Sequence, residues 1–157
     1  MITNHEVRSF LDGRRIAVIG ASDRKDSFAR TIDQALVEHG YEVVPVNPRL
    51  MELDDRPCYA RVADIPDPVD GAIVMVGPDH ATEAVDDVAA AGVQKIWLFK
   101  GVGAAGAASA DAISACERHG LDTVAGACPL MFLEPVGSVH KIHRSIRRVR
   151  GAVEKAG

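Results

Sequence analysis

The stretch RRIAVIGASDRKDSFARTIDQAL, residues 14–36, contains a strand, a loop and a helix that together indicate the fold class. An apolar run ends in Gly20, a short polar loop follows, and the residues after Ser27 favour a helix. This junction is also where α/β proteins bind phosphate groups, because the free N–H groups of the helix N-terminus face the loop. The usual dinucleotide fingerprint is incomplete, since Ser22 and Lys25 occupy the places of its second and third glycines.

The same succession of strand, loop and helix recurs along the chain. Short apolar runs rich in β-branched residues are typical of strands buried on both faces. The predicted strands are 15–20, 41–46, 71–76, 95–99 and 121–126. The predicted helices are 4–11, 27–39, 79–91 and 105–119, of which the last three end beside Gly40, Gly92 and Gly120. Alternation of this kind predicts an α/β fold, with a five-stranded parallel sheet and helices on both faces.

The remaining segments differ in character from this alternating part. Thr3 and Glu6 stand at capping-box spacing, which supports the leading helix. The stretch 47–68 is rich in Pro and Asp and is predicted to be irregular, with room for one helical turn. The last stretch, 138–157, is predicted to form a basic helix capped by Ser138. We expect residues 1–157 to form a single domain.

The composition narrows the class of protein. The 157 residues are 47% hydrophobic and 25% charged, with a net charge of −4, which gives no general attraction to nucleic acid or to a membrane surface. No apolar run approaches the roughly 20 residues of a membrane span, and the start has no signal-peptide core. Cys58, Cys116 and Cys128 are an odd number at irregular spacing, typical of reduced thiols. We therefore expect a cytoplasmic protein without nucleic-acid or membrane partners.

The loop after the first strand is compatible with phosphate binding. In a doubly wound sheet, ligands bind outside the carboxyl ends of the strands. Gly20 permits a sharp turn, Ser22, Ser27 and the helix N–H groups can face an anion, and Arg24 adds positive charge. A strand-to-helix turn that binds no nucleotide would also fit these residues.

The loop after the second strand discriminates between nucleotides. Enzymes that use NAD generally place Asp or Glu there to accept a hydrogen bond from the ribose. This chain has Asn47, Pro48 and Arg49 instead, and an amide followed by a cation suits a ligand with an extra phosphate near its ribose. NADP and coenzyme A both fit that description, and a simple turn is the alternative.

Three pieces of sequence resemble a known family: GYEVVPVNPR at 40–49, IWLFKGV at 96–102 and VAGACPLM at 124–131. From about Arg14 to Phe132 the chain resembles the small coenzyme A (CoA)-binding proteins. They are related to the CoA-binding domain of the succinyl-CoA synthetase α subunit and of ADP-forming acyl-CoA synthetases. The resemblance implies a Rossmann-like sheet with CoA across its carboxyl edge.

The resemblance also implies a role for individual positions. Gly20, Ala21 and Ser22 would approach the phosphates through backbone groups. The first loop would contribute Gly20, Ala21, Ser22, Arg24 and Ser27 to the site, and the second-strand corner would contribute Asn47, Pro48 and Arg49. The wall near the adenine or pantetheine would be formed by Val76, Gly77 and Pro78, and the far side by Lys100, Gly101 and Val102. The chain departs from the family at VMVGPDHA, 74–81, where relatives often carry a doubled proline.

The expected function is binding without catalysis. The synthetases carry ligase chemistry and a phosphorylated histidine on a second domain, and a chain ending at Gly157 leaves no room for it. We therefore expect a carrier or sensor of CoA or an acyl-CoA, with no catalytic residue and no metal site. A small NADP-dependent reductase and a CoA-binding subunit acting in trans with an acyl-CoA synthetase are the alternatives. A homodimer, with a second copy of the chain as the partner, is a further open alternative.

Two sets of reactive side chains have competing interpretations. Cys128 could form a mixed disulfide with the CoA thiol, or be a small residue that ends a strand. His140 and His143 could suggest a metal, but a solvated helix face is the simpler interpretation, since structural zinc usually needs four ligands.

Overall fold

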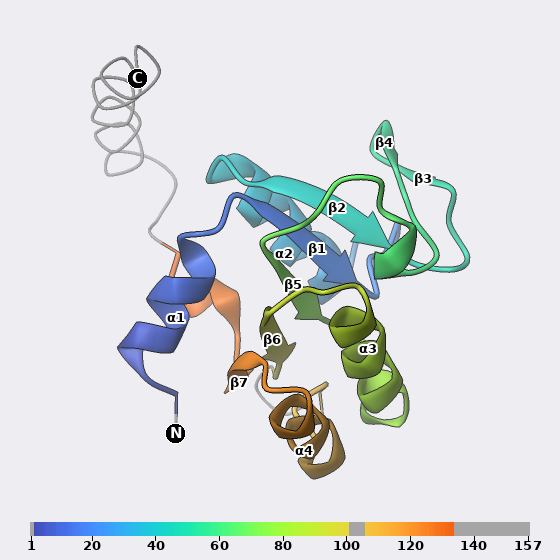
Figure 1. Ribbon diagram of the computed structural model, residues 1–157. Helices are drawn as coiled ribbons and strands as arrows, with labels where there is room; N and C mark the ends of the chain where they lie inside the picture. Colours follow the sequence, from blue (N-terminus) through green and yellow to red (C-terminus); the bar gives the residue numbers. More distant parts are fainter. Residues whose placement is uncertain (1, 101–105, 134–157) are drawn as a thin grey trace.

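The computed structural model describes residues 2–100 and 106–133, and its centre is a five-stranded sheet of parallel strands in the order β2-β1-β5-β6-β7 (Figure 1). The strands are β1 (Arg15–Ile19), β2 (Glu42–Val46), β5 (Gly71–Val74), β6 (Lys95–Phe99) and β7 (Asp122–Ala127). Strands β2, β1, β5 and β6 are buried over nearly their whole length, whereas only Val124 and Ala127 are buried in the edge strand β7. The predicted parallel sheet is confirmed, with boundaries that differ by one or two residues.

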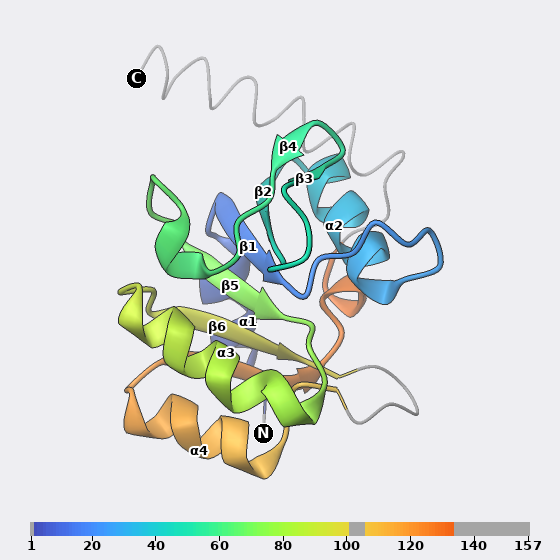
Figure 2. The ribbon, with the colours of Figure 1, turned by 90° about the vertical axis from the view of Figure 1, so that its right-hand side faces the viewer.

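Helices cover both faces of this sheet, as predicted (Figures 1 and 2). They are α1 (Asn4–Leu11), α2 (Phe28–Glu38), α3 (Pro78–Ala90) and α4 (Ala110–Arg118). One core layer packs α1 and α2 against one face and includes Trp97, which is fully buried. The other layer packs α3 and α4 against the opposite face through alanines and valines. Each strand therefore contributes side chains to both layers.

The helix ends follow the sequence signals, with one correction. Thr3 and Glu6 form the predicted capping box, and the glycines after α2, α3 and α4 have left-handed φ angles. The helix predicted at 105–119 is wrong at its start, because α4 begins at Ala110 with Ser109 as its N-cap. Gly106 has a left-handed φ of +61°, and the Ala107 N–H donates to the Phe99 carbonyl at 2.8 Å, so this part of the chain is bound to the end of β6 before the helix begins.

The segment 47–68 holds more structure than predicted. It contains the expected helical turn, the 3-10 helix η1 (Val62–Asp64), and also a two-stranded antiparallel sheet of β3 (Glu52–Leu53) and β4 (Arg56–Pro57). Asp54 and Asp55 join these strands with φ angles of 49° and 61°. Two consecutive left-handed residues make the tight hairpin turn that matches strand twist.

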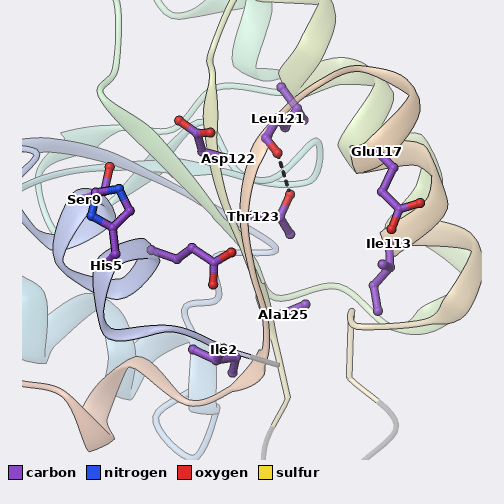
Figure 3. A pocket seen from close by; sticks show the side chains of 10 residues that line it. Ile2, His5, Ser9, Ile113, Glu117, Leu121, Asp122, Thr123 and Ala125 are labelled. Carbon is purple, nitrogen blue, oxygen red and sulfur yellow. Dashed lines mark hydrogen bonds between the residues drawn. The ribbon is translucent and has the colours of Figure 1, made fainter.

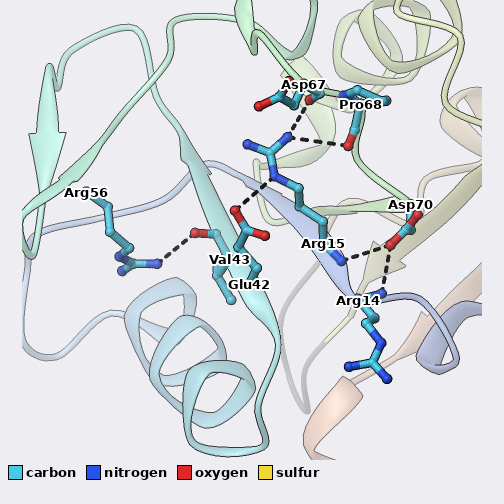
Figure 4. Close-up of polar contacts among 8 residues, drawn as sticks. All are labelled: Arg14, Arg15, Glu42, Val43, Arg56, Asp67, Pro68 and Asp70. Atoms are coloured by element: carbon cyan, nitrogen blue, oxygen red, sulfur yellow. Dashed lines mark hydrogen bonds and ion pairs between the residues drawn. The ribbon is translucent and has the colours of Figure 1, made fainter. Parts of the chain in front are cut away.

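Polar contacts hold the amino ends of the strands together (Figure 4). One carboxylate oxygen of Asp70, just before β5, accepts hydrogen bonds from the N–H groups of Arg14 and Arg15 at 2.8 and 2.9 Å. The Arg15 guanidinium pairs with Glu42 at 3.1 Å and also donates to the carbonyls of Asp67 and Pro68. Strands β2, β1 and β5 are thus fixed in register at this edge.

Two further findings concern the C-terminal stretch and membrane-spanning helices. The stretch 138–157, predicted to be a basic helix, lies outside the described residues, as do His140 and His143. Within residues 2–100 and 106–133, no helix is long and apolar enough to cross a membrane.

Candidate functional site

The strand order places the candidate site at the carboxyl edge of the sheet. Strands β1 and β5 are neighbours, but the chain leaves β1 for α2 on one face and β5 for α3 on the other (Figure 2). Loops that diverge at such a switch point leave room for a ligand between them. The residues predicted from sequence lie in the loops that follow these strand ends.

The loop between β1 and α2 begins with a tight turn at Gly20. Its φ is +88°, and an added Cβ would lie 3.1 Å from the backbone of Met75 and from the side chain of Val76. The N–H groups of Gly20 and Ala21 donate to the Val46 carbonyl at 2.9 and 3.3 Å. Glycine is therefore required here both by the backbone angle and by the close approach to the end of β5.

The rest of this loop contains the N-cap of α2 and a hydrogen bond that fixes the loop before it. Ser27 is the N-cap of α2 and accepts a hydrogen bond from the Ala29 N–H at 3.2 Å, so other first-turn N–H groups are left for a ligand. The Ser22 hydroxyl accepts from the Arg24 N–H at 3.1 Å, which fixes the loop. The Arg24 side chain is exposed and pairs with Asp26 at 3.4 Å, so its charge is partly compensated.

The loop after β2 is tied to the first loop by Asn47. Its amide group donates to the Ala21 carbonyl at 2.7 Å, and its side-chain oxygen accepts from the Arg49 N–H at 2.8 Å. Asn47 therefore holds the two loops together, a positioning role that sequence reasoning did not assign. Pro48 and Arg49 are exposed, and among the described residues the Arg49 guanidinium has no ion-pair partner.

The loop after β5 forms the opposite side of the switch point. Val76 is half-buried, whereas Gly77 and Pro78 are exposed. Gly77 is the N-cap of α3 without any capping side chain, and nothing lies within 4 Å of the place where its Cβ would be. The absence of a side chain at Gly77 leaves open space above the N-terminus of α3.

The ends of β6 and β7 complete this edge. Lys100 follows β6, its side chain is exposed and its N–H donates to the Ala127 carbonyl at 3.3 Å. Gly101 and Val102, predicted to close the far side, lie outside the described residues. Cys128 follows β7 as a half-buried free thiol. The Cys58 and Cys116 thiols are buried, and burial raises their pKa values.

A buried ion pair behind the second loop was not anticipated from the sequence. Asp33 on α2 is only 2% exposed, and its carboxylate accepts a hydrogen bond from the Arg56 guanidinium at 2.8 Å. Arg56 also donates to the Val43 carbonyl at 3.0 Å, so that it joins the hairpin to both α2 and β2 (Figure 4). Burial raises the pKa of Asp33, although the neighbouring guanidinium opposes this. The sequence signal was an acidic residue within the apolar stripe of α2.

This pair supports the candidate site through the backbone. The hairpin continues into Cys58 and Tyr59, and the Tyr59 carbonyl accepts from the Asn47 N–H at 2.9 Å. The Cys58 thiol lies 3.7 Å from the Asn47 carbonyl, to which it donates. The position of Asn47, and with it Arg49, therefore depends on the hairpin that Arg56 anchors.

Two hollows in the described part of the chain lie away from this edge. One, of about 400 Å³, borders the edge strand β7 between α1 and α4 and is lined by His5, Glu117 and Thr123 among others (Figure 3). A smaller one of about 290 Å³ lies between η1 and the end of α3. Within the described residues, no group of three or more His, Cys, Asp or Glu side chains could hold a metal ion.

The fold is that of a Rossmann-like α/β protein, and the candidate site lies at the switch point of its parallel sheet. The model of the CoA binding domain family matches residues 14–134, and the chain belongs to this family. The resemblance predicted from the strand-end motifs is thus confirmed.

The relatives include large enzymes and small proteins. Acetate–CoA ligase [ADP-forming] I of Archaeoglobus fulgidus is 32% identical over 118 residues, which are 72% of this chain and 17% of the ligase. Trans-feruloyl-CoA synthase FCS1 of an unknown prokaryotic organism is 30% identical over 62% of this chain and 14% of the synthase. A hypothetical protein from Pyrococcus horikoshii OT3 is similar in structure, with a TM-score of 0.73 and 30% identity over 83% of this chain and 89% of that one. The chain therefore spans about one sixth of the two enzymes.

Proposed function

We propose that this protein binds coenzyme A or an acyl-CoA at the carboxyl edge of its sheet and acts as a carrier or sensor without ligase activity of its own. The observation that carries the proposal is the switch point itself, in a chain of the CoA binding domain family. The N-terminus of α2, the open space above Gly77 and the exposed Arg49 follow the carboxyl ends of β1, β5 and β2, which are neighbouring strands of the sheet.

Each part of this region suits a part of the ligand. The N–H groups at the start of α2 would receive the pyrophosphate, because a helix N-terminus favours negative charge. Arg49 would receive the 3′-phosphate of the adenosine, since its guanidinium is exposed beside the end of β2, where an NAD site would carry an acid. Gly77 and Val76 would border the adenine or the pantetheine arm, and Lys100 the far side.

A binding role rather than a ligase role is supported by the relatives. The aligned region is only 17% of the acetate–CoA ligase and 14% of the feruloyl-CoA synthase, whereas the chain aligns with 89% of the small Pyrococcus horikoshii protein. The same observation favours a second candidate, a CoA-binding part that works in trans with a partner carrying the remaining domains. A ligase reaction that appears only when such a partner is added would support this second candidate.

Calorimetric titration with CoA, dephospho-CoA, NADP and NAD tests the proposal. We expect CoA to bind best and dephospho-CoA about tenfold more weakly, because a hydrogen bond to a charged group contributes about 1.5–3 kcal/mol. Micromolar affinity for NADP with no response to CoA would overturn the proposal in favour of a reductase.

Two matched variants identify the phosphate contact. Arg49→Ala should lower the affinity for CoA about tenfold and remove the difference between CoA and dephospho-CoA. Arg14→Ala removes an equally exposed cation from the opposite edge of the sheet and should change neither affinity. An unchanged CoA affinity in Arg49→Ala would exclude this residue from the site.

A further inference from the structure

A large aromatic side chain is exposed beside the proposed phosphate site. Phe28 is the first residue of α2 and directly follows the N-cap Ser27, yet it is 64% exposed. Its ring centroid lies 6.1 Å from that of Phe99, the last residue of β6. An apolar ring at the first position of a helix, where polar residues would serve the N-terminus better, calls for an explanation.

A second exposed apolar side chain lies on a neighbouring element. The 3-10 helix η2 (Pro129–Met131) follows β7 and packs beside α2 (Figure 2). It carries Met131, which is 75% exposed. We use the name Phe28 surface for the exposed ring of Phe28, the buried ring of Phe99 beside it and the exposed side chain of Met131 on the adjoining η2. Among the described residues only four large hydrophobic side chains are exposed, and two of them belong to this surface.

We propose that the ligand is a CoA thioester with an apolar acyl group, and that the acyl chain lies on the Phe28 surface. This inference rests on the proposed function, because it places the phosphates at the start of α2. From β1 to β6 the distance is two strand spacings, about 10 Å, which is within the reach of an extended pantetheine arm. An apolar acyl chain would cover the ring of Phe28, whereas free CoA would leave it in water.

The chain length and charge of the acyl group test this inference directly. The full chain is titrated with CoA, acetyl-CoA, hexanoyl-CoA and succinyl-CoA. Each methylene that leaves water fully should raise the affinity by up to about fourfold. A chain covered on one side only, equivalent to about two such methylenes, should make hexanoyl-CoA bind roughly tenfold more tightly than CoA. Succinyl-CoA should show no such gain, because its carboxylate would have to lose water against an apolar ring.

Two variants at opposite ends of α2 locate the contact. Phe28→Ser should reduce the gain of hexanoyl-CoA over CoA, taken as the ratio of the two affinities in the same variant, to less than twofold. Val37→Ser also removes an exposed apolar side chain, 47% exposed in the last turns of the same helix, and should keep the full gain.

The outcomes separate this inference from the proposed function. Equal affinities of the wild-type protein for CoA and hexanoyl-CoA would overturn the inference alone, as would a Phe28→Ser variant that keeps the gain. A Phe28→Ser variant that melts earlier yet keeps the gain would show that the surface is covered by the protein itself, which also overturns it. If none of the CoA compounds binds, the proposed function fails first.

Discussion

The two edges of the sheet are built from similar residue types that are used in opposite ways. At the amino edge, Asp70 and the guanidinium of Arg15 bind other parts of the chain, and the Lys95 ammonium donates to the Ser9 carbonyl at 2.9 Å. At the carboxyl edge, Arg49 and Lys100 are exposed without an ion-pair partner among the described residues. At the amino edge most charged groups bind the chain, with the guanidinium of Arg14 as an exposed exception, whereas the carboxyl edge leaves Arg49, Lys100 and helix N–H groups exposed.

The difference shows how a parallel sheet divides stability and binding between its ends. The polar groups of the amino edge fix the register of the central strands, whereas the loops of the carboxyl edge diverge and expose groups that suit a phosphorylated ligand. The loops of the carboxyl edge are themselves held in place by the buried ion pair of Asp33 and Arg56, which anchors the β3–β4 hairpin beside the loop after β2. Substitutions at the two edges should therefore separate stability from ligand affinity.

Breaking the buried pair should have the largest effect. Arg56→Ala leaves the Asp33 carboxylate buried without its guanidinium, which should lower the free energy of unfolding by about 3 kcal/mol. CoA affinity should fall as well, because the hairpin positions Asn47. Urea denaturation at neutral pH measures the first effect, and calorimetry the second.

A neighbouring arginine supplies the control for this prediction. Arg30 pairs with the more exposed Asp54 at 3.0 Å, so Arg30→Ala should cost less than about 1 kcal/mol. A loss in Arg56→Ala no greater than that in Arg30→Ala would show that the pair does not anchor the hairpin.

The next largest effect is expected at the turn after β1. Gly20→Ala places a residue with a Cβ in a left-handed backbone conformation, which costs about 1–2 kcal/mol of conformational free energy. The new Cβ would also lie 3.1 Å from the residues that follow β5. We expect a loss of about 2 kcal/mol in the free energy of unfolding and at least a tenfold loss of CoA affinity, measured by denaturation and calorimetry.

Gly77 offers the matched glycine on the other side of the switch point. Its φ is −68° and its Cβ position is open, so Gly77→Ala should change the free energy of unfolding by less than about 1 kcal/mol. If the ligand lies above α3, the added methyl group should still weaken CoA binding. If Gly77→Ala has wild-type stability and wild-type CoA affinity, the ligand does not lie beside Gly77.

The sheet and its edge were predictable because their signals are local. A strand such as β6 is buried on both faces, so its sequence is a continuous apolar run, and the glycines after the helices mark the turns. Because strands and helices alternate along the chain, the strands are parallel, and the loops that follow them all lie at the carboxyl edge of the sheet. The positions of Gly20, Arg49 and Gly77 at that edge follow from topology alone.

The remaining features depend on contacts between distant segments. Strands β3 and β4 have two residues each, too few for any periodicity, and their hairpin depends on Arg56 meeting Asp33, 23 positions earlier. The helix predicted at 105–119 starts late because Gly106 packs against β6, which outweighs the helix propensity of the alanines. Asn47 was predicted to line the site, but the sequence could not show that its amide joins two loops.

The smallest effect should come from the amino edge, and it should leave binding unchanged. The N–H groups of Arg15 and Arg14 lower the pKa of Asp70 below its ordinary value. Asp70→Asn keeps the shape but weakens both hydrogen bonds, so the free energy of unfolding should fall by about 1 kcal/mol at neutral pH, since the site is exposed. CoA affinity, measured by calorimetry, should equal that of the wild-type protein.

The pH dependence gives this prediction a second readout. A carboxyl whose pKa is lowered in the folded state contributes stability above its unfolded pKa of about 4, and the contribution is lost as the pH falls through the folded value. Denaturation measured from pH 6 down to pH 3 should therefore show a shallower acid loss in Asp70→Asn than in the wild type. Asp67→Asn, beside it at the same edge, should keep the wild-type slope, because Arg15 contacts the carbonyl of Asp67 and not its carboxylate. Equal slopes in all three proteins would mean that the carboxylate of Asp70 does not hold the strands in register, and the contrast between the two edges would then rest on the backbone alone.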